Sequence, residues 1–119
     1  MESELIIDVY KFIGEDILFG RHSEDGSPSA ESLRNHILEN WDKYERISIQ
    51  VDSVVQMTRP FLDEAFAKLL EHHSLEDFNQ KIYFPDAKEK VVQDLNNAFK
   101  VRLKIIQANQ ERDQDELGL

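Results

Sequence analysis

Apolar and polar positions follow the period of strands near the N-terminus and the period of helices further along the chain. Residues Leu5–Ile13, LIIDVYKFI, carry apolar side chains at both odd and even positions, which favours a buried strand. Gly14 and two acidic residues interrupt this run, and Ile17–Phe19 then has the composition of a second short strand. We therefore predict a hairpin. A loop over Gly20–Pro28 should follow, because turn-forming residues predominate there.

The middle of the chain predicts a helix, a strand and a second helix. Ser29 is a natural N-cap, and apolar side chains recur at three- and four-residue spacing over Ala30–Trp41. Ile47–Val51, ISIQV, alternates apolar and polar residues as a half-buried strand does. The run Phe61–His73 carries paired apolar rows four residues apart. Pro60 comes directly before this run and would lie in the first turn of the predicted helix, where the missing N–H of proline costs no hydrogen bond.

The last part of the chain predicts a short strand at Lys81–Phe84 and a long helix. Asp86 is expected to cap this helix, whose apolar face extends to Ile106. The sequence that follows is polar and acidic, so we predict a domain over residues 1–106 and a frayed or disordered acidic tail over residues 107–119. Because strands alternate with helices, the whole order indicates an α/β fold with parallel crossover connections.

The amino-acid composition excludes several classes of function. The 119 residues fit one domain and carry 24 acidic against 14 basic side chains, a net charge of −10. Such a surface repels phosphate backbones, so we expect no nucleic-acid partner. The absence of cysteine removes disulfides, thiolate nucleophiles and cysteine–metal sites. Because the sequence shows neither a long apolar run nor the basic start of a secretory signal, we expect a cytoplasmic protein that does not bind membranes.

The titratable side chains do not form a catalytic or metal-binding pattern. His72 and His73 are adjacent, and on a helix they would point about 100° apart, too far to share one ion easily. Asp63-Glu64 and Glu15-Asp16 are also adjacent pairs, and neighbouring residues do not face each other as a catalytic pair does. No phosphate-binding glycine loop or nucleophile motif occurs. We therefore predict no catalytic residues, no metal ligands and no cofactor, and a protein that is not an enzyme.

The stretch Ile47–Glu64, ISIQVDSVVQMTRPFLDE, joins a strand, a loop and a helix start. It resembles the central unit of the STAS-like α/β domains, a family of largely unassigned function related to the anti-sigma-factor antagonists of bacterial type. Pro60–Glu64 stands where the family has a Ser-Phe-Ala-Asp-Glu-type helix start. The resemblance covers about Leu5–Lys104 and includes Gly20-Arg21, Ser29–Arg34, Lys81–Phe84 and Arg102. It implies a single STAS-like domain, with a mixed four- to five-stranded sheet packed against three to four helices.

The resemblance also implies a regulatory and non-catalytic function. Anti-sigma-factor antagonists bind a protein partner through this loop and helix start, and in many of them the partner, a histidine-kinase-like ATPase, phosphorylates a serine there. A phosphate adds about two negative charges to such an interface. Pro60 occupies the usual position of that hydroxyl, so Thr58 and Ser53 are the remaining candidate phosphoacceptors. The alternative for Thr58 is a helix cap, which is the commoner role of threonine at a helix start.

We expect the partner-binding surface to span Val54–Glu64 together with the loop Arg21–Pro28. The predicted contacts come from Arg21, Met57, Thr58, Arg59, Asp63 and Glu64. The alternative for Arg59 is a solvated surface side chain. Two other functions remain open: a small-ligand or nucleotide sensor with an anion site at the helix start, and a non-enzymatic subunit of a larger complex. The expected state is a monomer or a weak homodimer, because the long last helix either covers the sheet or pairs with a second copy.

Overall fold

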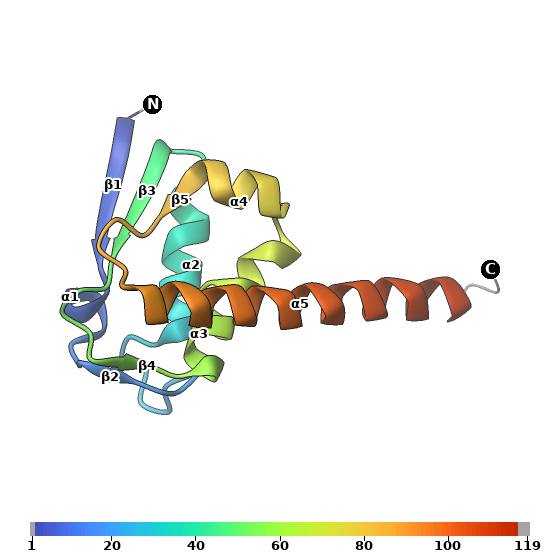
Figure 1. Cartoon of the computed structure of the whole chain (residues 1–119), viewed down its shortest axis with the longest axis horizontal. Helices are drawn as coiled ribbons and strands as arrows, with labels where there is room; N and C mark the ends of the chain where they lie inside the picture. The colour runs from blue at the N-terminus through green and yellow to red at the C-terminus, as the bar shows by residue number, and fades with distance from the viewer. Residues whose placement is uncertain (1, 117–119) are drawn as a thin grey trace.

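Two parallel sheets form the strand layer of the molecule. The computed structural model describes residues 2–116, and the side chains of residues 3–112. In the larger sheet the strands lie in the order β1 (Glu2–Asp8), β3 (Tyr44–Gln50) and β5 (Ile82–Tyr83) (Figure 1). The smaller sheet pairs β2 (Ile17–Leu18) with β4 (Gln56–Met57). Since every pair is parallel, each connection between paired strands crosses over through at least one helix.

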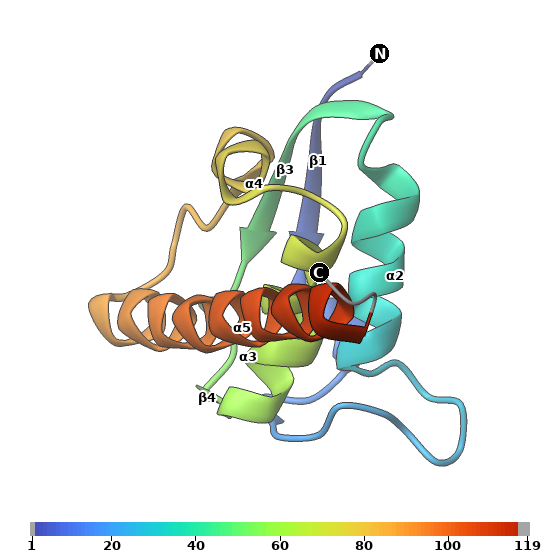
Figure 2. The same ribbon diagram turned by 90° about the vertical axis from the view of Figure 1, so that its right-hand side faces the viewer.

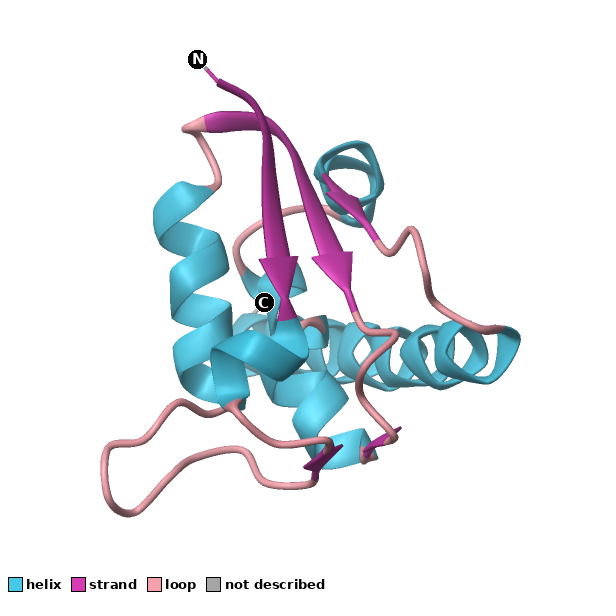
Figure 3. Ribbon diagram, turned by 90° about the vertical axis from the view of Figure 1, so that its left-hand side faces the viewer, coloured by secondary structure: helices cyan, strands magenta, loops and turns pink. Residues whose placement is uncertain are grey.

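Helices lie against one face of the larger sheet. Apart from the short helix that follows β1 directly, they stand in front of the strands in Figure 2 and behind them in Figure 3, and within residues 2–116 no helix covers the opposite face. The helical segments are α1 (Val9–Ile13), α2 (Ala30–Asn40), α3 (Arg59–Ala65), the 3₁₀ segment η1 (Ala67–Glu71), α4 (Leu75–Lys81) and α5 (Glu89–Glu116). The C-terminal part of α5 projects beyond the rest of the molecule (Figure 1). No helix of the described chain is both long enough and apolar enough to cross a membrane.

The register of the larger sheet places apolar side chains on the face that the helices cover. Ile7 of β1 pairs with Ile49 of β3, and Ile47 of β3 pairs with Leu5 on one side and with Ile82 on the other. All of these side chains are buried except Leu5, which is half-buried. Because alternate residues of a strand share a face, they form one layer of the core. The opposing layer comes from the helical side and includes Leu33, Ile37, Phe61, Leu62, Phe66, Leu95 and Phe99.

The predicted α/β class is confirmed, and the first long helix forms where its pattern places it. Ser29 caps α2: its hydroxyl accepts a hydrogen bond from the Ser32 N–H, and the Ser32 hydroxyl accepts one from the Ser29 N–H at 2.6 Å. This reciprocal pair satisfies two backbone donors at the helix start. The predicted strand at Ile47–Val51 overlaps β3, and the one at Lys81–Phe84 contains β5.

The predicted hairpin is wrong. The Asp8 carboxylate accepts a hydrogen bond from the Lys11 N–H at 3.1 Å and starts α1, so Val9–Ile13 is helical. Gly14 then ends this helix in the left-handed region, with φ 88°. The helix turns the chain away from β1, and the segment at Ile17 pairs in parallel with β4 instead. The mixed apolar pattern of Val9–Ile13 reflects one short helical turn with Val9 buried.

The predicted helix Phe61–His73 is interrupted. At Phe66 the backbone leaves the helical region, with φ −121° and ψ −52°, so α3 ends there and η1 continues in a tighter winding. Sequence reasoning also missed α4, which Ser74 caps through its hydroxyl on the Asp77 N–H. This helix has only seven residues, and Phe78 is the one that is buried. A single buried position cannot show a helical period in the sequence.

Asp86 does not cap the last helix. Its carboxylate accepts hydrogen bonds from the Val51 N–H at 2.9 Å and the Asp52 N–H at 3.3 Å, which fixes the turn after β3, and α5 begins only at Glu89. The predicted mixed sheet is likewise replaced by two parallel sheets. The described chain contains five α-helices, more than the three to four expected. The α5 helix continues past Ile106 to Glu116, while the division into residues 1–106 and 107–119 stays a prediction.

Candidate partner-binding surface

Two carboxylates at the end of α3 hold four basic side chains, and we refer to this group as the carboxylate cluster. Its anionic members, Asp63 and Glu64, are 5% and 1% exposed. Asp63 accepts hydrogen bonds from the Arg102 Nε at 2.8 Å and from the Arg21 guanidinium at 2.6 Å. Glu64 forms ion pairs with Lys68 at 3.0 Å, with Arg21 at 3.2 Å and with Arg34. Residues adjacent in sequence thus bind different partners, and Arg21 alone bridges both.

The basic partners keep both carboxylates ionised. Burial by itself would raise the pKa of Glu64, but hydrogen bonds from Arg34, Lys68 and Arg21 outweigh it and lower the pKa to about 2. Burial opposes ionisation at Asp63 as well, and hydrogen bonds from Arg102 and Arg21 lower the pKa of that carboxyl below its usual range. Such groups are poor proton donors near neutral pH, because a general acid or base needs a pKa close to the working pH.

The carboxylate cluster fixes the position of α3. Arg34 comes from α2, Arg102 from α5 and Arg21 from the loop before α2, so three separate segments are joined to one turn. Arg34 also donates to the Glu64 backbone carbonyl at 2.9 Å. Buried charges joined in this way tolerate little displacement, because a lost partner leaves an uncompensated charge.

One group of side chains has the composition of a metal site, but its surroundings do not suit a cation. Ligand atoms of His22, Glu31 and Glu64 lie within 4.8 Å of one another. The Glu64 carboxylate already contacts Arg34, Lys68 and Arg21, and these positive charges would repel a metal ion. His22 itself pairs with Glu31 at 3.2 Å. We therefore assign these residues to the ion-pair network.

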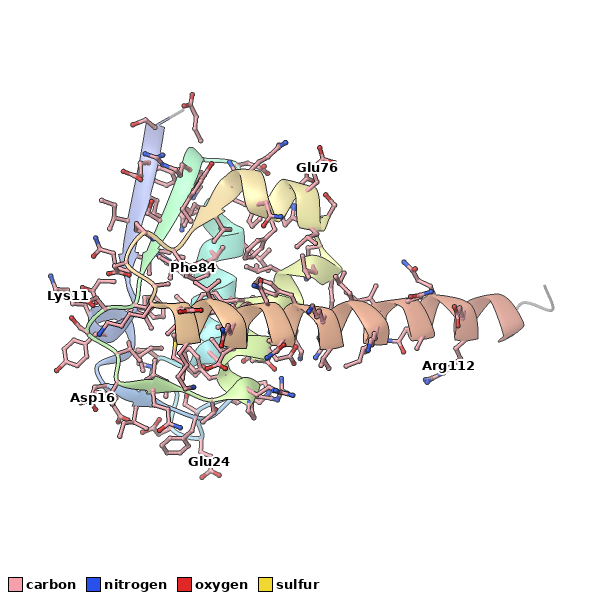
Figure 4. The ribbon with its side chains drawn as sticks, in the orientation of Figure 1. Lys11, Asp16, Glu24, Glu76, Phe84 and Arg112 are labelled. Carbon is pink, nitrogen blue, oxygen red and sulfur yellow. The ribbon has the colours of Figure 1, made fainter. Side chains whose placement is uncertain are left out.

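The segment before α3 is fastened to β2 through its backbone. The Val55 N–H donates to the Asp16 carbonyl at 2.7 Å, and the Thr58 N–H donates to the Leu18 carbonyl at 2.9 Å. Asp16 lies at the end of the small sheet, as Figure 4 shows. Thr58 occupies the N-cap position of α3, yet its hydroxyl makes no cap hydrogen bond. It donates instead to the Phe19 carbonyl at 3.1 Å and so links the helix start to the strand beside it.

Side chains of this fastened segment point outward, and we call Val55–Arg59 the exposed segment. Val55 is 73% exposed, Arg59 is exposed, and Met57 and Thr58 are half-buried. A groove runs beside it between β4, α3 and α5, lined by Gln56, Met57, Leu62, Lys90, Val91 and Asp94. Phe19, which follows β2, is 68% exposed. Val55 itself lines the groove, and exposed apolar side chains that gather at a groove are typical of an interaction surface.

The structure separates the predicted site residues into two groups. Met57, Thr58 and Arg59 lie in the exposed segment, and Ser53 is exposed on the turn before it. Asp63 and Glu64 face inward, and Arg21 reaches them with a side chain that remains 38% exposed. Sequence reasoning did not find Arg34 and Lys68 as partners of Glu64, although the spacing of Glu64 and Lys68 is the i, i+4 pattern of helical ion pairs.

A comparison with models of known protein families gives a match over more than half of the chain. The family described as STAS-like domain of unknown function (DUF4325) matches residues 29–92, from the cap of α2 to the first turn of α5. The chain belongs to this STAS-like family. The match contains β3, the exposed segment and both carboxylates of the cluster. Neither a search of curated proteins nor a search of solved structures gave a match.

Proposed function

We propose that this STAS-like domain is a non-catalytic regulatory module that binds a protein partner through the exposed segment. The supporting observation is that the exposed segment is held by many contacts on its inner side and is open to solvent on its outer side. The carboxylate cluster and the bonds to β2 hold the segment rigidly from behind, while Val55, Met57 and Arg59 present apolar and cationic groups at the surface. A pre-ordered surface loses little conformational entropy on binding. The related anti-sigma-factor antagonists make a histidine-kinase-like ATPase the class of partner to test.

Thr58 and Ser53 are the proposed acceptors for a regulatory phosphate. In the reaction, the hydroxyl oxygen attacks the γ-phosphorus of ATP, the bond to the β-phosphate oxygen breaks, and ADP and the hydroxyl proton are released. A phosphorylated Thr58 could no longer donate a hydrogen bond to the Phe19 carbonyl. The phosphate would also place a charge of about −2 beside Arg59. Ser53 is exposed and lies outside these contacts, so its phosphorylation would change only the charge of the surface.

The experiment is an affinity capture from native lysate with the full chain as bait, with and without Mg-ATP. Recovered proteins and the intact mass of the bait are measured in the same samples. The proposal predicts an ATPase of the kinase-like class and, with Mg-ATP, a bait with one added phosphate at Thr58 or Ser53. Capture of that ATPase without phosphate would indicate a constitutive binding module.

Other outcomes would favour the remaining functions. A bait that is stabilised by nucleotides in a thermal-shift screen, without any partner, would indicate a ligand sensor. The helix start offers such a ligand few donors, because α3 has seven residues and Pro60 in its first turn lacks an N–H. A partner that co-purifies in fixed ratio and ignores Mg-ATP would indicate a structural subunit. Either result would overturn the proposed regulatory switch.

A further inference from the structure

The outer edge of β1 has no hydrogen-bonding partner within the described chain. β1 contributes seven residues and pairs with β3 on one side only. Within the described backbone of residues 2–116 and the described side chains of residues 3–112, no group bonds to the backbone of residues 2–7 on the other side. In a parallel pair, alternate residues direct their N–H and C=O groups away from the partner strand. About three residues of β1 therefore present unpaired backbone groups along this edge.

The features that usually protect an edge strand are largely missing here. Natural edges are kept short, interrupted by bulges, or given proline or lysine. The sequence of β1, ESELIID, contains neither proline nor lysine, and its register with β3 advances without a bulge from Glu4 to Asp8. Figure 3 shows β1 at the border of the sheet, and Figure 1 shows that α2, which Figure 3 draws alongside this strand, lies behind the plane of the strands. The edge is thus open to another extended chain.

The face of the sheet beside this edge is open as well. All-parallel sheets are usually covered on both faces, whereas this one has helices on one face only. On the uncovered face Ile6 is 56% exposed, and Tyr83 of β5 is also exposed beneath the Arg46 guanidinium, which lies 5.3 Å from the ring centroid. Figure 4 shows Phe84 just beyond β5, where it lines the same hollow as Ile6. An added strand would extend both faces of the sheet.

The charge of β1 selects between possible occupants. Three of its seven residues are acidic and none is basic, with the Glu4 carboxylate paired with Arg46 at 3.0 Å and the Asp8 carboxylate at the start of α1. If β1 of a second copy paired in the fully overlapping antiparallel register, Glu2 would stand opposite Asp8, and like charges placed directly opposite are destabilising. Two chains of net charge −10 would also repel each other. A basic strand meets neither obstacle.

We propose that the free edge of β1 binds an extended segment of a partner protein in which basic and apolar residues alternate. Its backbone would pair with the outward groups of β1. Its basic side chains would lie on the open face near Glu4 and Asp8, and its apolar side chains on the helix-covered face next to half-buried Leu5. This surface uses residues outside the matched range 29–92 and is separate from the exposed segment, so it can fail or succeed independently of the proposed function.

The test uses a synthetic seven-residue peptide of alternating lysine and valine, titrated into the full chain. Chemical shifts and amide exchange are followed by nuclear magnetic resonance. We expect shift changes along Glu4–Asp8 and exchange slowed about tenfold or more at alternate residues of β1. A peptide of alternating glutamate and valine should cause neither effect, and N-methylation of the lysine–valine peptide at alternate residues should abolish binding.

A pair of variants locates the site. Ile6→Lys puts a positive charge on the open face beside the incoming lysines and should weaken binding about tenfold or more. Val101→Lys, at an exposed position on α5, should leave binding unchanged. Shift changes that centre on other elements, equal binding of the acidic peptide, or no change along β1 would overturn the proposal. Protection of β1 that grows with protein concentration, without peptide, would identify a second copy as the occupant and would overturn it too.

Discussion

Glu64 is the residue on which the packing of α3 depends most. Its carboxylate is 1% exposed and lies among Arg34, Lys68 and Arg21. Taking a charge from water into such a site is costly, and only the surrounding cations make it tolerable. Removal of the negative charge would leave three half-buried positive groups close together without compensation.

Replacing Glu64 by glutamine should therefore destabilise the protein by about 3 kcal/mol. The measurement is the free energy of urea unfolding at neutral pH. Glu31→Gln is the matched control, because Glu31 pairs with His22 near the surface and should change stability by less than about 1 kcal/mol. Equal effects of the two substitutions would contradict the role given to the carboxylate cluster.

Stability should also fall with pH through the same carboxylate. The pKa of Glu64 is about 2 in the folded protein and 4.5 ordinarily, so its contribution is complete above pH 4.5 and is lost as the pH falls toward 2. Over that interval the wild type should lose about 3 kcal/mol more than Glu64→Gln, which has no carboxyl to protonate there. Unfolding measured at pH 6, 4.5 and 3 should show the two proteins converging. Parallel curves would contradict the assignment.

At the scale of elements, short helices differ most from the sequence expectation. The periodic runs of α2 and β3 were predictable, since each has several apolar residues in a clear period and α2 has the Ser29 cap. α1 and α4 were not, because one buried residue in each gives no period.

The candidate site was likewise predictable from the sequence only in part. Met57, Thr58 and Arg59 could be placed at the surface from the loop pattern. The inward turn of Asp63 and Glu64 depends on Arg34 and Arg102, which come from positions 30 and 39 residues away. Local patterns carry no information on such distant pairings, because they are set by how the helices pack.

The end of α1 offers a test at this scale. Gly14 has φ 88°, a conformation that strains any residue with a Cβ. Gly14→Ala should cost about 1 kcal/mol of stability although nothing lies within 4 Å of the added atom. Gly20 is the control, because its φ is not positive and the nearest atom to an added Cβ is 3.7 Å away. The measurement is the thermal unfolding midpoint of Gly14→Ala and Gly20→Ala. An equal decrease in the two variants would contradict the role of Gly14 at the end of α1.

At the scale of the whole molecule, α5 divides into a packed and a projecting part. Leu95, Ala98 and Phe99 are buried, Arg102 reaches Asp63, and Ile106 packs against the core from a half-buried position. Beyond Ile106 the helix continues to Glu116 with an almost entirely polar sequence. The first part closes the fold, while the second makes little contact with it (Figure 1).

Truncation after Ile106 should therefore change the free energy of unfolding by less than about 1 kcal/mol. Truncation after Ala98 should unfold the domain, because it removes Phe99 and leaves the Asp63 carboxylate without Arg102. Circular dichroism and urea unfolding of both shortened chains provide the measurement. A large loss of stability in the first would show that residues 107–119 belong to the folded domain.

A charge reversal within the exposed segment tests whether this segment binds the protein partner. Wild-type, Arg59→Glu and Lys100→Glu baits, each checked for an unchanged unfolding midpoint, are compared in the same affinity capture. Lys100 is an exposed basic residue on α5, away from the segment. We predict that Arg59→Glu recovers about a tenth or less of the partner that the wild type recovers, and that Lys100→Glu recovers it fully. Full recovery by Arg59→Glu would contradict the account.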